Sequence, residues 1–347
     1  MFNTKNISFY LTSLAILIGG GYLAKKLKEK LEPNDEYKLI REYIMNDSPL
    51  YGANKPKLWI HTNYARNSRQ WESFQSRNSN ELNQPYLHIT VQSIIRKCGD
   101  NFHICLIDDE SFSKLIPKWD INMEKVTGPH KKHYRDVGLL SILYYYGGLV
   151  IPNSMICYEN MKPFFDKCIS SNKPCFSEEV NKSLDMINDK TKPVFIPSIH
   201  FMAAPKQNEQ IGILKDYVKQ MFNSGHFTDE FEFTNKIGHK CLDMVTSNQA
   251  NVLCGSYTGI KTNKGKPVII DDLMEEKLID YREDLYGIVI PSDEMLLRTK
   301  YQWFAILQEE DVIHTTPCLS KYLFKSIYND YGITNVQGRC SDNHLEI

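Results

Sequence analysis

The sequence predicts an α/β fold in which a mostly parallel sheet is flanked by helices. Two apolar runs, 57–62 and 102–107, are typical of buried strands, and the apolar residues of 87–98 between them recur at helical spacing. A strand, a helix and a second strand at this spacing predict a βαβ unit with a right-handed crossover. The length of 347 residues is sufficient for one large domain with a substantial core.

The predicted elements follow one another with clear boundaries. The first helix ends near Gly99, which can cap it, and the second strand ends at Asp108 and Asp109. A helix over 134–146 leads through a pair of glycines into a strand at 149–151, because glycine tolerates the positive φ of a tight turn. The later predicted elements are a strand over 194–203, helices over 211–222, 231–245 and 271–280, and short strands over 268–270 and 288–290.

The amino-terminal segment differs from the rest of the chain. No charged residue occurs over 6–24, and a helix of that length spans about 28 Å, close to the roughly 30 Å hydrocarbon core of a bilayer. A bulky residue stands where signal peptidase requires a small one, so we expect an uncleaved anchor over 1–24. A charged stem over 25–54 and one domain over 55–347 follow it. The alternative is a segment that lies on the membrane surface.

Charge and cysteine content limit the compartment and the partners. Four lysines directly after the apolar segment place the large domain on the cytoplasmic side by the positive-inside rule. The formal net charge of -1 gives no overall attraction to nucleic acid, so nucleic acid is not an expected partner. The nine cysteines have no CxxC spacing, which argues against a zinc site and indicates free thiols in a reducing compartment.

Three segments together resemble the capsular polysaccharide synthesis glycosyltransferases, a GT-A-type group related to the Och1-like, DXD-containing sugar transferases. The segments are PKLWIH (56–61), SIIRKCGDNFHICLIDDESF (93–112) and HYRDVGLLSILYYYGG (133–148). Their order and spacing carry the resemblance. It implies a GT-A-like fold and a membrane-anchored enzyme that transfers a sugar from a nucleotide-sugar donor to a glycan, lipid or protein acceptor.

The resemblance also implies where the nucleotide sugar binds. His61 ends the strand that holds the nucleotide in that family, and Asp136 falls on the family's helix aspartate. Gly147 and Gly148 fall on its glycine turn. The arginine that the family has three residues after the aspartate is Leu139 in this chain.

The metal-binding carboxylates of the family are replaced by Pro152, Asn153 and Ser154. Mn²⁺ and Mg²⁺ prefer carboxylate oxygens, whereas Asn153 and Ser154 offer only neutral ones. No metal ligand is therefore assigned, and either ion would need ligands from elsewhere in the chain. Asn153 and Ser154 remain candidates for contact with the nucleotide sugar itself.

Basic side chains are an alternative means of neutralising a diphosphate. The phosphate-binding candidates are Lys131, Lys132 and Arg135, although a solvated basic loop explains the same pattern. For catalysis, Asp271, Asp272 and His314 are candidates, although the two aspartates fit the capped start of a helix better. His200, within an apolar run, is typical of a satisfied core histidine.

Two functions therefore remain open. The chain is either a glycosyltransferase that works without a metal, or a catalytically inactive descendant that serves as a membrane-attached binding or scaffold protein. The loss of the carboxylates and of the arginine in one place motivates the second. A cleft with convergent Asp, Lys and His groups would favour the first, and a collapsed pocket the second.

Overall fold

The computed structural model describes residues 55–62, 84–126, 129–182, 193–224 and 230–328. All of them belong to the unit Asp47–Ile347. The expected anchor over 1–24 and stem over 25–54 lie outside the described residues. Within the described ranges, no helix is both long enough and apolar enough to cross a membrane.

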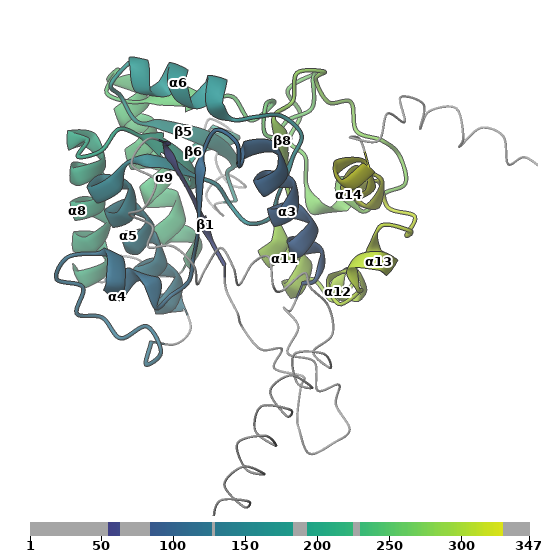
Figure 1. Ribbon diagram of the computed structural model, residues 1–347, viewed down its shortest axis with the longest axis horizontal. Coiled ribbons are helices and arrows are strands. Elements are labelled where there is room, and N and C mark those ends of the chain that lie inside the picture. Colours follow the sequence, from purple (N-terminus) through teal and green to yellow (C-terminus); the bar gives the residue numbers. More distant parts are fainter. Residues whose placement is uncertain (1–54, 63–83, 127–128, 183–192, 225–229, 329–347) are drawn as a thin grey trace, which may run out of the picture. The chain divides into compact units, whose positions relative to one another are not determined.

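A six-stranded mixed sheet forms the centre of the fold (Figure 1). In spatial order its strands are β2 (His103–Ile107), β1 (Lys57–His61), β3 (Gly148–Val150), β6 (Phe195–Ala204), β5 (Cys175–Val180) and β7 (Asn251–Leu253). β1 pairs in parallel with β2 and β3, and β5 pairs in parallel with β7, whereas β6 is antiparallel to both of its neighbours. The prediction of a mostly parallel sheet is therefore confirmed, with β6 as the exception.

The helices between the first strands lie where the sequence predicts them. α3 (Tyr86–Cys98) connects β1 to β2 and ends before Gly99, whose φ of -61° is right-handed rather than left-handed. α5 (Pro129–Tyr146) connects β2 to β3 and begins earlier than the predicted residue 134. The first turns of α5 are polar, so the spacing of apolar residues could not predict that the helix includes them. Proline is favourable at a helix start because its missing N–H has no partner there in any case.

The glycine turn after α5 is fixed by its surroundings. Gly147 and Gly148 have φ of +67° and +113°. A Cβ on Gly147 would lie 2.6 Å from the backbone nitrogen of Lys206, and one on Gly148 would lie 2.3 Å from the carbonyl oxygen of Lys57. The indole Nε1 of Trp59 donates to the carbonyl oxygen of Gly147 at 2.9 Å. This turn requires glycine for backbone reasons alone.

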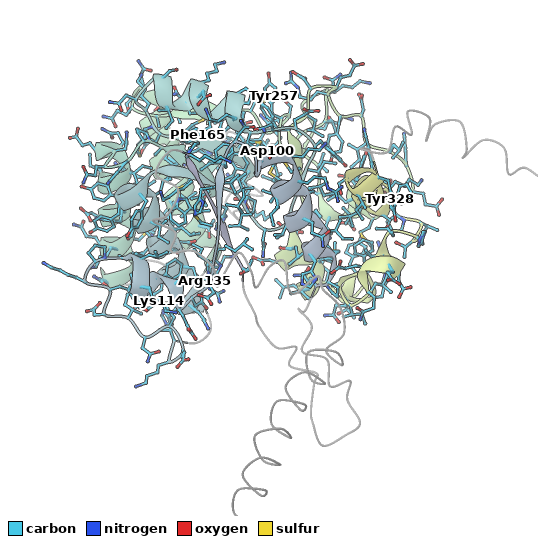
Figure 2. The ribbon with its side chains drawn as sticks, viewed as in Figure 1. Asp100, Lys114, Arg135, Phe165, Tyr257 and Tyr328 are labelled. Carbon is cyan, nitrogen blue, oxygen red and sulfur yellow. The ribbon has the colours of Figure 1, made fainter. Side chains whose placement is uncertain are left out.

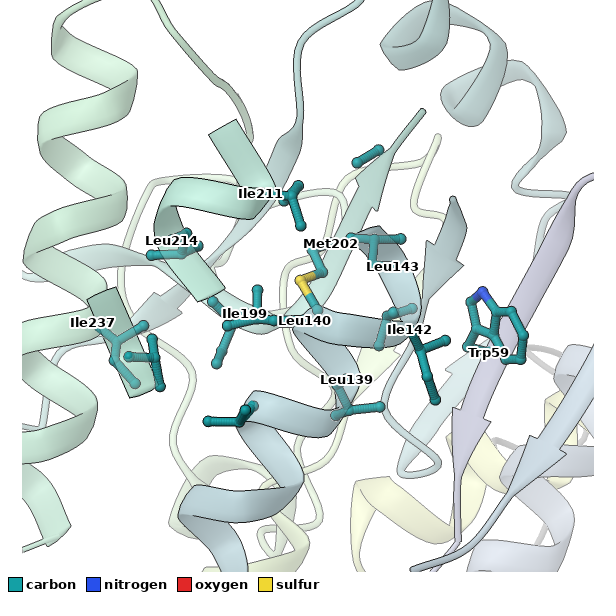
Figure 3. Close-up of a cluster of buried hydrophobic side chains, with 14 of the residues drawn as sticks. Trp59, Leu139, Leu140, Ile142, Leu143, Ile199, Met202, Ile211, Leu214 and Ile237 are labelled. Carbon is teal, nitrogen blue, oxygen red and sulfur yellow. The ribbon is translucent and has the colours of Figure 1, made fainter. Parts of the chain in front are cut away.

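One face of the sheet packs against α5 and α9 (Glu230–Thr246), while α8 (Glu209–Ser224) and α4 (Ser111–Leu115) pack against α5. Figure 3 shows this core, in which residues of α5 meet Met202 of β6 and Trp59 of β1. Leu139, which stands in the place of the family's arginine, is one of its buried members. A buried leucine at this position stabilises the core and leaves no cation there.

A second core lies around α3 and the carboxyl-terminal part of the chain. Its elements are the antiparallel pair β4 (Met155–Cys157) and β8 (Gly287–Val289), and the short helices α10 (Ile270–Leu273), α11 (Ser292–Leu297), α12 (Gln302–Ala305), α13 (Glu309–Val312) and α14 (Cys318–Tyr328). α6 (Lys162–Ser170) lies outside this core. α6 packs on β6 through Phe164, whose ring lies 6.0 Å from that of Phe201.

Two predictions in this part of the chain were wrong. The run 268–270 is not a strand, because Val268 and Ile270 are buried in the second core and Ile270 already begins α10. The helix predicted over 271–280 extends only to Leu273. Short apolar runs report burial, and burial does not distinguish a strand from a packed loop.

Candidate functional site

The carboxyl-terminal ends of the parallel strands bring polar groups together at one edge of the sheet. His61 ends β1, Asp109 follows β2 and Asn153 follows β3. Because β6 runs in the opposite direction, the first half of β6 lies at this edge together with the end of β5. From β1 the chain passes to β2 on one side, and from β2 it crosses to β3 on the other side of β1. The strand order therefore reverses at β1. In α/β sheets, ligands bind at the carboxyl edge beside such a switch point.

Asp109 lies at the centre of a basic cluster, which we define as Asp109, His61, Lys131 and Arg135. Arg135 (Figure 2) donates to both carboxylate oxygens of Asp109 at 2.7 Å. His61 Nε2 lies 3.0 Å and Lys131 Nζ 3.2 Å from the same carboxylate. Burial alone would raise the pKa of Asp109, but its hydrogen bonds with Arg135 and His61 outweigh burial and lower it. Asp109 is therefore ionised at neutral pH and holds three basic side chains at the strand ends.

The neighbouring aspartate has a different role. Asp108 Oδ1 accepts hydrogen bonds from the backbone N–H and the hydroxyl of Ser111 at 2.9 and 2.6 Å. These bonds fix the turn into α4. The ring of His61 stacks on Phe112 of α4, with centroids 5.5 Å apart, so the turn also orients the histidine of the basic cluster.

Asp136, His200 and Glu179 form a second group, the acidic row. His200 Nε2 lies 3.5 Å from Asp136, and His200 Nδ1 lies 3.5 Å from Glu179 and 3.2 Å from the hydroxyl of Ser198. Burial lowers the pKa of His200, but the hydrogen bonds with Asp136 and Glu179 outweigh it and raise the pKa to about 10. Burial raises the pKa of Glu179, and the hydrogen bond with His200 then lowers it to about 2. The raised pKa keeps His200 protonated at neutral pH. Its ring nitrogens have partners, as predicted, but its side chain is 33% exposed, so His200 does not belong to the core.

The acidic row lines a small cavity between β5, β6, α5 and α9. Its volume of about 10 Å³ is room for about one water molecule or one hydroxyl group. The walls are Asp136, Glu179, Ile196, Pro197, Ser198, Ile199, His200, Thr234, Ile237 and Gly238.

α11 is tied to the same edge by ion pairs. Lys132, at the start of α5, lies 3.4 Å from Asp293, and Lys182, after β5, pairs with Glu294. Arg298 lies 3.2 Å from Glu294 as well. Exposed pairs of this kind contribute about 0–1 kcal/mol each, so they position α11 without fixing it strongly.

The segment after β3 does not fit a divalent ion. The hydroxyl of Ser154 is buried and donates to the carbonyl oxygen of Ile290 at 2.8 Å. The backbone carbonyl of Asn153 accepts from Thr90 at 2.5 Å. These bonds attach the segment to α3 and to the residue that follows β8. Throughout the described ranges, no group of three or more His, Cys, Asp or Glu side chains is arranged to hold a metal.

The three catalytic candidates lie in the carboxyl-terminal part. Asp272 accepts from the backbone N–H of Ile269 at 2.9 Å and caps α10. Asp271 bonds with Tyr301, which lowers its pKa most, and with Arg298 at 2.5 Å. Arg298 in turn connects it to Glu294 of α11. His314 is exposed in the turn between α13 and α14.

Sequence reasoning missed Glu179 as a site residue. It is the second of two carboxylates at the end of β5, just as Asp109 is the second of two after β2. Paired carboxylates therefore mark both strand ends, although at β5 only Cys175 and Phe176 before them are apolar. The partnership of Glu179 with His200 had no sequence signal, because it depends on a strand that runs antiparallel.

Comparisons with known proteins find no family model and no curated sequence that match this chain. Among solved structures, "PaToxG Glycosyltransferase" aligns at 13% identity with a TM-score of 0.36, over 65% of this chain and 80% of that one. The galactosyltransferase LgtC, in complex with donor and acceptor sugar analogs, aligns at 9% identity with a TM-score of 0.34, over 60% and 76%. Neither is described as a capsular polysaccharide or Och1-like enzyme. Alignments with TM-scores below 0.5 do not establish a shared fold.

Proposed function

We propose that this protein is a glycosyltransferase of GT-A type that binds a nucleoside diphosphate sugar at the carboxyl edge of its sheet without a divalent ion. The basic cluster carries the proposal. Lys131 and Arg135 bring two positive charges against the single negative charge of Asp109, before His61 is counted. A net positive group at a switch point suits a diphosphate, whose charge grows as the sugar leaves.

The positions of the resembling segments support the proposal. PKLWIH falls on β1, and SIIRKCGDNFHICLIDDESF falls on α3, β2 and the start of α4. HYRDVGLLSILYYYGG falls on α5 and its glycine turn. The segments therefore lie on consecutive elements of one βαβαβ unit, and the candidate nucleotide contacts His61 and Asp136 lie at its carboxyl edge.

In the proposed reaction, the basic cluster binds the diphosphate and stabilises the nucleoside diphosphate as it leaves the sugar. The sugar passes to a hydroxyl of a glycan, lipid or protein acceptor. Attachment to a membrane through residues 6–24, with the domain on the cytoplasmic side, belongs to the same proposal and would favour a membrane-bound acceptor.

The test is calorimetry on the full chain in detergent with UDP, GDP, CMP and their sugars, with and without Mn²⁺. We expect binding of a diphosphate ligand without Mn²⁺, weakened about tenfold by Lys131→Gln through loss of one charge-assisted contact. Lys114→Gln, an exposed lysine of α4, is the matched control and should leave affinity unchanged. Binding that requires Mn²⁺, or no binding by the folded protein, would contradict the proposal.

A specific observation supports a second function, a non-catalytic binding or scaffold protein attached to the membrane. The cavity at the carboxyl edge admits about one water molecule, and the cations of the basic cluster are already paired with Asp109. A descendant without catalysis needs no open donor cleft. The same calorimetry distinguishes the two functions, because the scaffold requires no affinity for nucleoside diphosphates.

A further inference from the structure

We infer that Glu179 and His200 form a subsite for a hydroxyl group of a sugar, and that Asp136 is the positioning residue that holds His200. The inference rests on the proposed function only for the source of that sugar, which would be the donor or the acceptor. The subsite itself can be examined with free sugars.

The first observation is the loose geometry of the acidic row. Both carboxylates lie 3.5 Å from the ring nitrogens of His200, and the Ser198 hydroxyl lies 3.2 Å from His200 Nδ1. Strong hydrogen bonds between charged groups are about 2.7–2.9 Å long, so none of these contacts is a close one. A hydroxyl group both donates and accepts. A sugar hydroxyl that replaces the Ser198 hydroxyl at Nδ1 can therefore accept from the imidazolium and donate to Glu179 at the same time.

The second observation is the gradient of exposure along the row. The side chain of Asp136 is 6% exposed, whereas those of His200 and Glu179 are 33% and 34% exposed. A ligand can therefore reach Glu179 and His200 but not Asp136. The buried carboxylate keeps the imidazole charged and fixes its orientation, which is a positioning role.

The third observation is the size and lining of the cavity. Its volume of about 10 Å³ admits a single hydroxyl group and excludes a sugar ring. The ring would lie at the mouth, beside the apolar walls formed by Pro197, Ile199 and Ile237. Sites for small molecules commonly combine apolar walls with a few fixed polar groups.

The fourth observation is the sign of the charge. Asp136 of α5 and Glu179 of β5 face the imidazolium of His200, and the described lining residues of α9, which are Thr234, Ile237 and Gly238, are uncharged. Two carboxylates against one imidazolium give a net negative group, which repels phosphate and accepts a neutral polyol. Lys182 also acts electrostatically on Glu179 but pairs with Glu294.

Arg135 of the basic cluster and Asp136 of the acidic row are consecutive residues of α5. The structure therefore places a positive group and a negative, hydroxyl-binding group at the same carboxyl edge, each with one member on the same turn of α5. A sugar linked to a diphosphate has the same distribution of chemistry, with charge at one end and hydroxyl groups at the other.

The experiment is saturation-transfer NMR on the full chain with glucose, galactose, mannose and N-acetylglucosamine as probes. We expect at least one sugar to bind the wild type, and Glu179→Gln and His200→Gln each to weaken it about tenfold, since each removes one hydrogen bond to a charged group. Glu209→Gln, on an exposed glutamate at the start of α8, is the matched control. The two site variants are independent, so failure of one to fold leaves the other as the test.

No sugar binding by the wild type, or undiminished binding by both folded site variants, would overturn the inference. The positioning role of Asp136 has its own readout. Asp136→Asn should lower the pKa of His200, followed by NMR titration, so that sugar binding is lost at a lower pH than in the wild type. An unchanged His200 titration would contradict that role.

The outcomes separate this inference from the proposed function. Sugar binding through Glu179 without any affinity for nucleoside diphosphates would support the subsite and contradict the transferase. Affinity for nucleoside diphosphates without sugar binding would support the transferase and contradict the subsite.

Discussion

Replacing Asp109 by asparagine removes the only negative charge of the basic cluster while keeping the shape of the side chain. In the wild type, Asp109 accepts two bonds of 2.7 Å from Arg135 and lies 3.0 Å from His61 and 3.2 Å from Lys131. The side chain is 17% exposed. In the variant, the cations would face one another without a counter-charge.

The expected loss of stability follows from this burial. Removing one partner of a buried, hydrogen-bonded ion pair costs about 3–5 kcal/mol, and removing an exposed partner costs about 0–1 kcal/mol. Asp109 is mostly buried, and asparagine keeps one acceptor oxygen for Arg135. We therefore expect the free energy of unfolding to fall by about 2–3 kcal/mol at pH 7.

The pH dependence has a defined sign. The folded-state pKa of Asp109 is lowered, so its contribution is fully present above the unfolded pKa of about 3.9. The contribution is lost only as the pH falls through the lower folded value. The difference in stability between the wild type and Asp109→Asn should accordingly shrink as the pH falls below about 3.9.

The assay is urea unfolding of the full chain followed by tryptophan fluorescence. Asp166→Asn is the matched control, because Asp166 pairs with Lys162 at 2.6 Å but is 57% exposed, and it should cost about 0.5 kcal/mol or less. A double-mutant cycle with Arg135→Met measures the coupling directly. A loss in Asp109→Asn no larger than that of the control, with no coupling to Arg135, would refute the reasoning.

Three further outcomes can be measured on the same protein. Gly148→Ala should lower Tm far more than Gly265→Ala, because the new Cβ at position 148 would lie 2.3 Å from the carbonyl oxygen of Lys57. Gly265 also has a positive φ, but a Cβ there would meet no atom within 4 Å. Similar shifts in Tm for the two variants would contradict the predicted clash. In urea titrations, the stability advantage of the wild type over His200→Gln should be complete below about pH 6.5 and decline as the pH rises towards 10. The reason is that folding raises the pKa of His200. A stability advantage that grows with pH would contradict this prediction. In a Cys340→Ser background, a thiol reagent should label native protein at Cys254 alone, because the other seven described cysteines are buried, and mass spectrometry of the labelled peptides would detect any exception.

The sequence predicted those elements whose pattern reflects local chemistry. β1, β2, α3 and β6 lie within one or two residues of their predicted ranges. Over five or more residues, the spacing of apolar side chains indicates both that a segment is buried and whether it is a helix or a strand. β4 and β7, with three residues each, are too short to show a period. β5 loses its alternation where Glu178 and Glu179 enter the strand.

For the candidate site, the sequence identified groups but not their partners. It singled out His61, Lys131 and Arg135, yet only the fold unites them on Asp109, since that contact joins three elements far apart in the chain. Asn153 and Ser154 lie at the predicted strand end, but tertiary bonds to Thr90 and Ile290 engage the Asn153 carbonyl and the Ser154 hydroxyl.

The sequence by itself therefore determined the α/β class, the glycine turn and the absence of carboxylates after β3, because each depends on residues adjacent in the chain. The tertiary structure decided the direction of β6 and, through it, the acidic row. Strand direction depends on how distant segments pair, and local propensity is the same for parallel and antiparallel neighbours. His200 became a charged group only because an antiparallel strand placed it between Asp136 and Glu179.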